Sequence, residues 1–100
     1  MSYKTLEDIN AAKELISPPG VTLADTLEAY NITQYDLALR MNRPVISINE
    51  IIKGKAVITP ETAYQLENIL KIPGSFWLNR EANYRIELAE IAEAEKHIAK

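Results

Sequence analysis

Cysteine is absent from the 100 residues, which excludes both a disulfide framework and a zinc site built on thiolates. No apolar run approaches the eighteen or so residues that a membrane span requires. The N-terminus, MSYKTLEDIN, has acidic residues where a signal peptide would have an apolar segment. These absences predict a cytoplasmic protein that does not associate with membranes.

The sequence also has little of the alternating hydrophobicity that marks β-strands, and the longest such stretch is 56–58, Ala-Val-Ile. Internal repeats and low-complexity tracts are absent, while the composition is 47% hydrophobic and 25% charged, as in ordinary globular proteins. We therefore expect an all-α fold of five to six helices in a single domain, 1–100. Its parts would be an N-terminal extension helix at about 3–17, a core at 18–80 and a long C-terminal helix at 75–100.

Groups that would support catalysis or metal binding are sparse. His97 is the only histidine, and no nucleophile is placed next to a base by any recognisable spacing. Glu87, Glu90, Glu93 and Glu95 are spread around one helix, where carboxylates are normally solvated rather than joined at a cation. The sequence predicts no enzyme activity, no cofactor and no metal.

Helix starts are well marked by threonines that are followed by an acidic residue or a proline, a pattern that satisfies free N–H groups at a helix N-terminus. Expected starts are Thr5, Thr22, Thr33 and Thr59, and a last long helix begins at Ser75. Expected ends are the SPPG sequence at 17–20, then Asn31, Gly54 and Pro73-Gly74.

The segment 33–54, TQYDLALRMNRPVISINEIIKG, contains two short runs of helical apolar periodicity separated by Asn42-Arg43-Pro44. Pro44 suits the first position of a helix, because its missing N–H has no partner there. Asn42 tolerates the left-handed backbone of a tight turn, and Gly54 suits a helix C-terminus. This spacing predicts a helix-turn-helix, although the same spacing also occurs in helix bundles that do not bind DNA.

The polar residues of this segment predict how DNA would be bound. The second helix presents Ser47, Asn49, Glu50 and Lys53 on or near its outer face, and such side chains can contact base edges. Around it, the residues expected at phosphates are Gln34, Arg40, Arg43 and Lys55. Residues 33–55 carry a net charge of +2, while the rest of the chain sums to −5.

The C-terminal segment carries an apolar stripe. Trp77, Leu78 and Tyr84 lie beside Phe76 and are expected in the core. Further along, Tyr84, Leu88, Ile91 and Ile98 follow spacings of three and four, interrupted by one acid, Glu95. This stripe either folds back on its own domain or forms an interface with a second copy or another protein.

Four sequence blocks together resemble a known family. They are PPG at 18–20, KGK at 53–55, ITPETA at 58–63 and SFWLNREANYR at 75–85. With the helix-turn-helix, they resemble HigA-type antitoxins, also called VapI or plasmid-maintenance antidote proteins, of the XRE/Cro-repressor superfamily. The resemblance covers about residues 18–85.

This resemblance implies a lambda-repressor-like DNA-binding domain that dimerises and binds double-stranded operator DNA upstream of its own gene. It implies an autorepressor in a type II toxin–antitoxin system, which also neutralises a partner toxin of the RelE/HigB kind. Gln34 would hold a phosphate at the start of the first motif helix, and residues 45–50 would form the recognition helix.

Two departures from the family pattern leave alternatives open. Relatives often begin the recognition helix with polar residues, whereas this chain has Pro44-Val45-Ile46. Val45 and Ile46 can contact a thymine methyl but cannot form bidentate hydrogen bonds, and Glu50 repels phosphate. The protein would then be an interaction module with weak or lost DNA binding. The helix expected before residue 18 fits a different alternative, in which the chain is the regulatory part of a longer protein with an ImmA/IrrE-type peptidase region. The HExxH motif of such a peptidase does not occur in this sequence.

Overall fold

The structure, a computed structural model, describes residues 4–98, and these residues form six α-helices. The helices are α1 (Leu6–Leu15), α2 (Pro19–Ala29), α3 (Gln34–Met41), α4 (Val45–Ile52), α5 (Pro60–Leu70) and α6 (Gly74–Ile98). The all-α fold with a long C-terminal helix is confirmed. The expected positions 3, 99 and 100 of the terminal helices lie outside the described residues. Across 4–98, none of the helices is long and apolar enough to cross a membrane.

Three of the four predicted N-caps are confirmed. Thr5 forms a reciprocal capping box with Asp8 at the start of α1. The Thr33 hydroxyl accepts a hydrogen bond from the backbone N–H of Asp36 at 3.0 Å, and the Thr59 hydroxyl accepts one from Thr62 at 3.2 Å. These caps place the starts of α1, α3 and α5 where the sequence predicts them.

The predicted start of α2 at Thr22 is wrong. The N-cap is Pro18 instead, four residues before Thr22 and with an extended backbone (φ −66°, ψ 155°), and the helix begins at Pro19. The two prolines fix the φ angles that a helix entry needs, so the sequence that ends α1 also starts α2. The Thr22 hydroxyl instead accepts hydrogen bonds from Arg80, the shorter being 3.1 Å. Two other starts differ by one residue, since Pro44 is the N-cap of α4 and α6 begins at Gly74.

The helices α2, α3 and α4 end in the same way. Asn31, Asn42 and Gly54 have left-handed backbones with φ of 58°, 55° and 76°. In each case the following N–H bonds to a carbonyl five residues back, which is the Schellman arrangement. The chain therefore turns sharply at these three positions, where the sequence predicts the turn or the helix end, and the short helices pack closely against one another.

Buried apolar residues form one large cluster between α2, α3, α4, α5 and the start of α6, with Trp77 at 0% exposure. We call this group the main cluster. A carboxylate, Glu81, is also buried beside it, at 5% exposure. Its Oε1 accepts a hydrogen bond from the Ile58 N–H at 2.7 Å, and Arg85 pairs with its other oxygen. Glu81 thus fastens the connection between α4 and α5 to α6.

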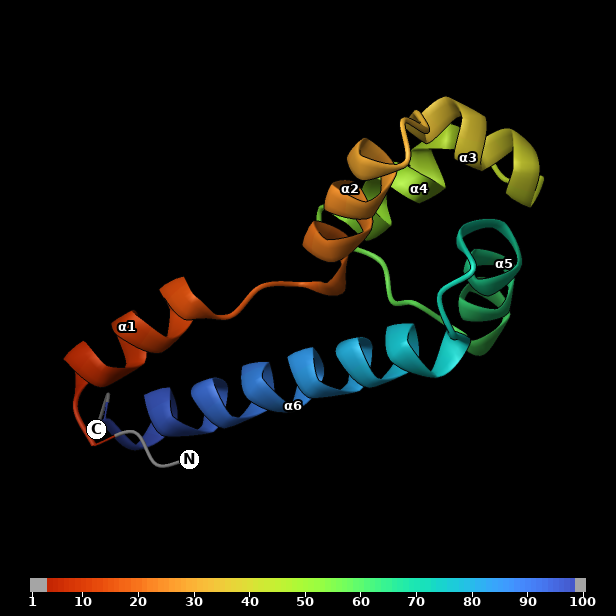
Figure 1. Cartoon of the computed structure of the whole chain (residues 1–100). Helices are drawn as coiled ribbons and strands as arrows, with labels where there is room; N and C mark the ends of the chain where they lie inside the picture. The colour runs from red at the N-terminus through yellow and green to blue at the C-terminus, as the bar shows by residue number, and fades with distance from the viewer. Residues whose placement is uncertain (1–3, 99–100) are drawn as a thin grey trace.

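A second, smaller group, the arm cluster, joins α1 to the C-terminal half of α6 (Figure 1). Ile9, Ala12 and Ile91 are buried there, and Lys13 pairs with Glu95 at 3.0 Å. Between the two clusters, Arg80 donates hydrogen bonds to Thr22 and to the Pro18 carbonyl at 3.2 Å. The result is an elongated molecule of 48 × 22 × 20 Å, with the helix-turn-helix at one end and α1 at the other (Figure 1).

Candidate DNA-binding surface

The helix-turn-helix is held by buried residues on the facing sides of α3 and α4. Leu37, Ala38 and Met41 of α3 and Ile48 and Ile51 of α4 are all at most 3% exposed. Ala38 has the smallest side chain of the five and also lines the turn between the helices. Because both helices are anchored in the main cluster, the outer side of α4 is held rigidly.

The outer side of α4 has two different halves. Its first turn is apolar, with Val45 44% exposed and Ile46 63% exposed. Its second turn is charged, because Glu50 is exposed and Lys53 follows as the exposed C-cap. Ser47 and Asn49 are half-buried at the edges. The residues predicted to contact bases therefore lie on or beside one accessible face.

Gln34 and Asn49 are joined across the motif. The Nδ2 of Asn49 donates a hydrogen bond to the Oε1 of Gln34 at 3.2 Å. An asparagine amide carries two N–H donors and one oxygen acceptor, so Asn49 keeps one donor and its acceptor. That remaining pair is what bidentate contact with an adenine edge uses. The contact was not predicted from the sequence, in which the two residues were assigned separate roles.

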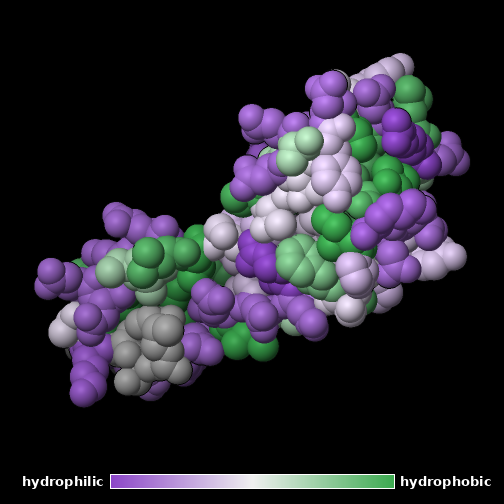
Figure 2. Space-filling view, viewed as in Figure 1, coloured by the Kyte–Doolittle hydropathy of each residue, from purple (hydrophilic) through white to green (hydrophobic). Residues whose placement is uncertain are grey.

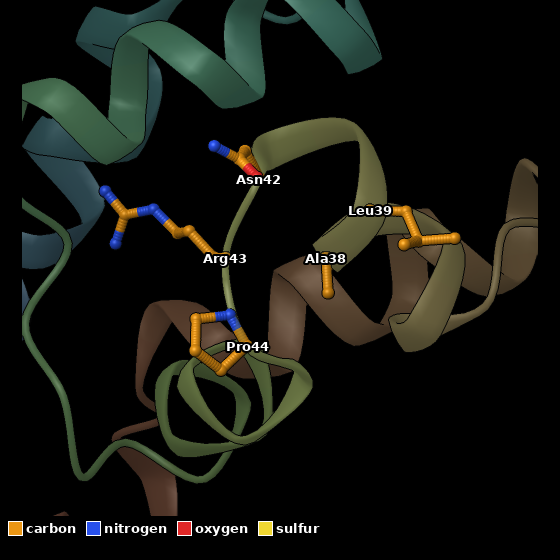
Figure 3. Close-up of a pocket in the computed structure, with 5 residues that line it drawn as sticks. All are labelled: Ala38, Leu39, Asn42, Arg43 and Pro44. Atoms are coloured by element: carbon orange, nitrogen blue, oxygen red, sulfur yellow. The ribbon is translucent and has the colours of Figure 1, made fainter.

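An open hollow of about 250 Å³ lies at the turn and is lined by Ala38, Leu39, Asn42, Arg43 and Pro44 (Figure 3). Arg43 extends from it towards α5, where its Nε donates to the Gln65 Oε1 at 2.9 Å. Gln65 in turn donates to the Met41 carbonyl at 3.3 Å. Arg43 thus ties the turn to α5, and the phosphate contact expected of it stays a prediction.

The other predicted phosphate-binding cations are accessible. Arg40, Lys53 and Lys55 are exposed, and within residues 4–98 none of them forms an ion pair. In contrast, Lys13 and Lys96 at the opposite end of the molecule are paired with glutamates. Within the same range, no three histidine or acidic residues are grouped as a metal site would need.

The four residues predicted for a dimer or partner interface lie along α6. Ile91 is buried against α1, and Ile98 packs at the edge of the same cluster. Tyr84 and Leu88 are half-buried. For Ile91 the stripe folds back within its own chain, and an interface role for the other three stays a prediction. Figure 2 shows apolar patches both at the α1 end and at the helix-turn-helix end, separated by polar surface.

Comparison with known sequences agrees with this geometry. The sequence model of the helix-turn-helix family matches residues 23–77, from α2 to the first turn of α6. The chain belongs to the helix-turn-helix family. Virulence-associated protein A of Dichelobacter nodosus is 33% identical over 70 residues, which are 68% of this chain and 69% of that protein.

Solved structures also resemble this chain. A HigA-family addiction module antidote protein from Coxiella burnetii is 28% identical, with a TM-score of 0.73 over 80% of this chain and 88% of that one. The Pseudomonas aeruginosa antitoxin HigA, solved with the higBA promoter, is 21% identical, with a TM-score of 0.71 over 81% of this chain and 88% of that one. The resemblance to HigA antitoxins that the four sequence blocks indicate is confirmed.

Proposed function

We propose that this protein is a transcriptional regulator that acts as the antitoxin of a type II toxin–antitoxin system. It binds double-stranded DNA upstream of its own gene, represses that operon, and neutralises a partner toxin of the RelE/HigB kind in the cytoplasm. The observation that carries the DNA-binding part is the outer face of α4. It projects from the helix-turn-helix and is flanked by Arg40, Lys53 and Lys55, which are exposed and have no ion-pair partner among the described residues 4–98.

The antitoxin part is supported by the 28% identity to the HigA-family antidote protein, over most of both chains. A second copy would supply a second recognition helix. In helix-turn-helix dimers, paired recognition helices lie about 34 Å apart and bind two half-sites on one side of the duplex. The proposed form is accordingly a homodimer on an operator with two similar halves.

The test is a titration of the purified chain against labelled DNA from upstream of its own gene, followed by fluorescence anisotropy. A scrambled duplex of equal length and composition is the control, and both are measured at low and near-physiological salt. We expect the preference for its own DNA to persist at the higher salt, because base contacts do not release counterions. Equal binding to both duplexes, lost as salt rises, would contradict the proposal.

A second candidate is favoured by the apolar first turn of α4 and by Glu50. A protein-interaction module that retains the fold but binds DNA weakly would also expose Val45 and Ile46. This candidate predicts inhibition of the toxin encoded beside the gene at protein concentrations that leave the upstream DNA unbound. Measuring both activities on the same preparation distinguishes the two functions.

A further inference from the structure

The first turn of α4 exposes two aliphatic side chains that the fold does not use. Val45 is 44% exposed and Ile46 is 63% exposed, and neither is among the apolar residues that pack on the main cluster. Ile46 lies on the outer side of the helix, away from the buried Ile48 and Ile51, whereas Val45, three residues before Ile48, lies at the edge of that outer side in the exposed first turn. The exposed part of each side chain costs solvation free energy that burial against a partner would recover.

The position of these two side chains limits what they can recognise. The N-terminal residues of a recognition helix are those that contact base edges in the major groove. Aliphatic side chains form no hydrogen bonds there, and the one apolar group that a base edge presents is the C5-methyl group of thymine. Aliphatic side chains at this position can therefore distinguish thymine from cytosine, which has no such methyl group.

The one polar side chain in the first turn of α4 is Ser47, which is half-buried, and two neighbouring polar side chains, Asn49 and Arg43, are held by other partners. Asn49, one turn further along, is held by Gln34 at 3.2 Å, so its reach is fixed. Arg43, which could otherwise cover the first turn, extends towards α5 and bonds to Gln65 at 2.9 Å. No arginine or lysine of α4 itself precedes its C-cap, Lys53, so guanine edges have no bidentate partner at the first turn.

We propose that Val45 and Ile46 read thymine methyl groups, and that the chain selects operators with thymines under the first turn of α4. The occupant of this apolar surface is thus the major groove of a thymine-containing duplex. This inference rests on the proposed DNA-binding function and adds the base that this part of the helix recognises.

The test removes the methyl groups without changing base pairing. The upstream duplex is prepared in two forms, one with thymidine and one with deoxyuridine at every thymidine position, and anisotropy titrations compare them. Burying one methyl-sized group changes affinity by about fourfold. We expect the deoxyuridine duplex to bind wild-type protein more weakly by about that factor for each methyl contacted.

Variants assign the effect to the two residues. Ile46→Ala and Val45→Ala should each bind the thymidine duplex more weakly and lose part of the difference between the two duplexes, as in a double-mutant cycle. The matched control is Val21→Ala in α2, since Val21 and Val45 are both 44% exposed. Val21→Ala should keep the full difference. Circular dichroism checks that all three variants are folded.

Two results would overturn the inference while leaving the proposed function intact. One is a preference for upstream over scrambled DNA that is the same with thymidine and deoxyuridine. The other is a deoxyuridine effect of equal size in wild type, Ile46→Ala and Val45→Ala, which would place the methyl contact elsewhere. If the protein shows no preference for upstream DNA in either form, both proposals are overturned. If Ile46→Ala loses toxin neutralisation but keeps DNA binding, the surface belongs to a protein partner and the thymine inference is overturned.

Discussion

At the scale of single residues, Asn49 and Lys53 show how one helix can divide two tasks. Asn49 is half-buried and held at 3.2 Å by Gln34, so its free amide groups have a fixed direction. Lys53 is exposed at the end of α4 with a long flexible side chain and no ion pair within residues 4–98. A fixed amide suits base recognition, while a mobile cation suits any phosphate.

Alanine variants should separate these tasks. We expect Asn49→Ala to reduce binding to the upstream duplex by about 1–3 kcal/mol and to leave binding to scrambled DNA nearly unchanged. Lys53→Ala should weaken both duplexes alike and lower the slope of log affinity against log salt by about one. Lys96→Ala, which removes an exposed lysine near the far end of α6, is the control. Identical behaviour of Asn49→Ala and Lys53→Ala would refute this division.

Some of these single positions could be predicted and others could not. Asn31, Asn42 and Gly54 are residue types that adopt left-handed backbones easily, so the sequence alone indicates three helix ends. Lys71 also has a left-handed backbone (φ 62°). Lysine has no preference for that conformation, so the sequence does not indicate a helix end there. The Gln34–Asn49 and Arg43–Gln65 contacts depend on how α3, α4 and α5 are oriented, which periodicity does not determine.

At the scale of helices, the close approach of α2 to the C-terminal end of α4 sets the position of the recognition helix. A Cβ atom on Gly20 would lie 2.2 Å from the Ile51 carbonyl oxygen and 2.3 Å from that of Ile52. Both obstacles are backbone, so neither can rotate away. The start of α2 at Pro19 brings Gly20 to this contact, whereas the predicted start at Thr22 would have left Gly20 in a loop.

Gly20→Ala should therefore destabilise the protein by about 3 kcal/mol, because α2 and α4 must separate to admit the methyl group. Gly74→Ala is the matched control, since a Cβ there would have its nearest neighbour at 3.4 Å. That variant should stay within about 1 kcal/mol of wild type. Urea unfolding of both variants tests this. Equal stability of the two variants would mean that α2 and α4 can separate at Gly20 at little cost in free energy.

At the scale of the whole molecule, α6 connects two groups of buried residues that share no other helix. The main cluster holds the helix-turn-helix, and the arm cluster holds α1 against the far half of α6. The sequence left open whether the stripe on α6 folds back or binds a partner, because an apolar stripe has the same spacing in either case. Because α1 packs on Ile91, the stripe folds back on its own chain at that residue.

The arm cluster is small enough to open by itself. Ile9 is fully buried between α1 and α6, and its truncation to alanine removes contacts worth about 2–5 kcal/mol. We expect Ile9→Ala to increase hydrogen exchange in α1 and the end of α6 while α3 and α4 keep their protection and DNA affinity is unchanged. Leu15→Ala, at an 84% exposed position of the same helix, should change neither. Increased exchange throughout the chain would show that both clusters unfold together.

The placement of Trp77 gives the protein an internal spectroscopic reporter. It is the only tryptophan in the chain, it is fully buried in the main cluster, and its ring meets the edge of Phe76 at 5.1 Å between centroids. Its indole N–H has no hydrogen-bond partner among the described residues, so its emission should resemble that of indole in an apolar solvent. Fluorescence will follow the helix-turn-helix end alone, whereas circular dichroism at 222 nm sums all six helices. Melting curves from the two signals will coincide only where the arm and the helix-turn-helix unfold as one unit.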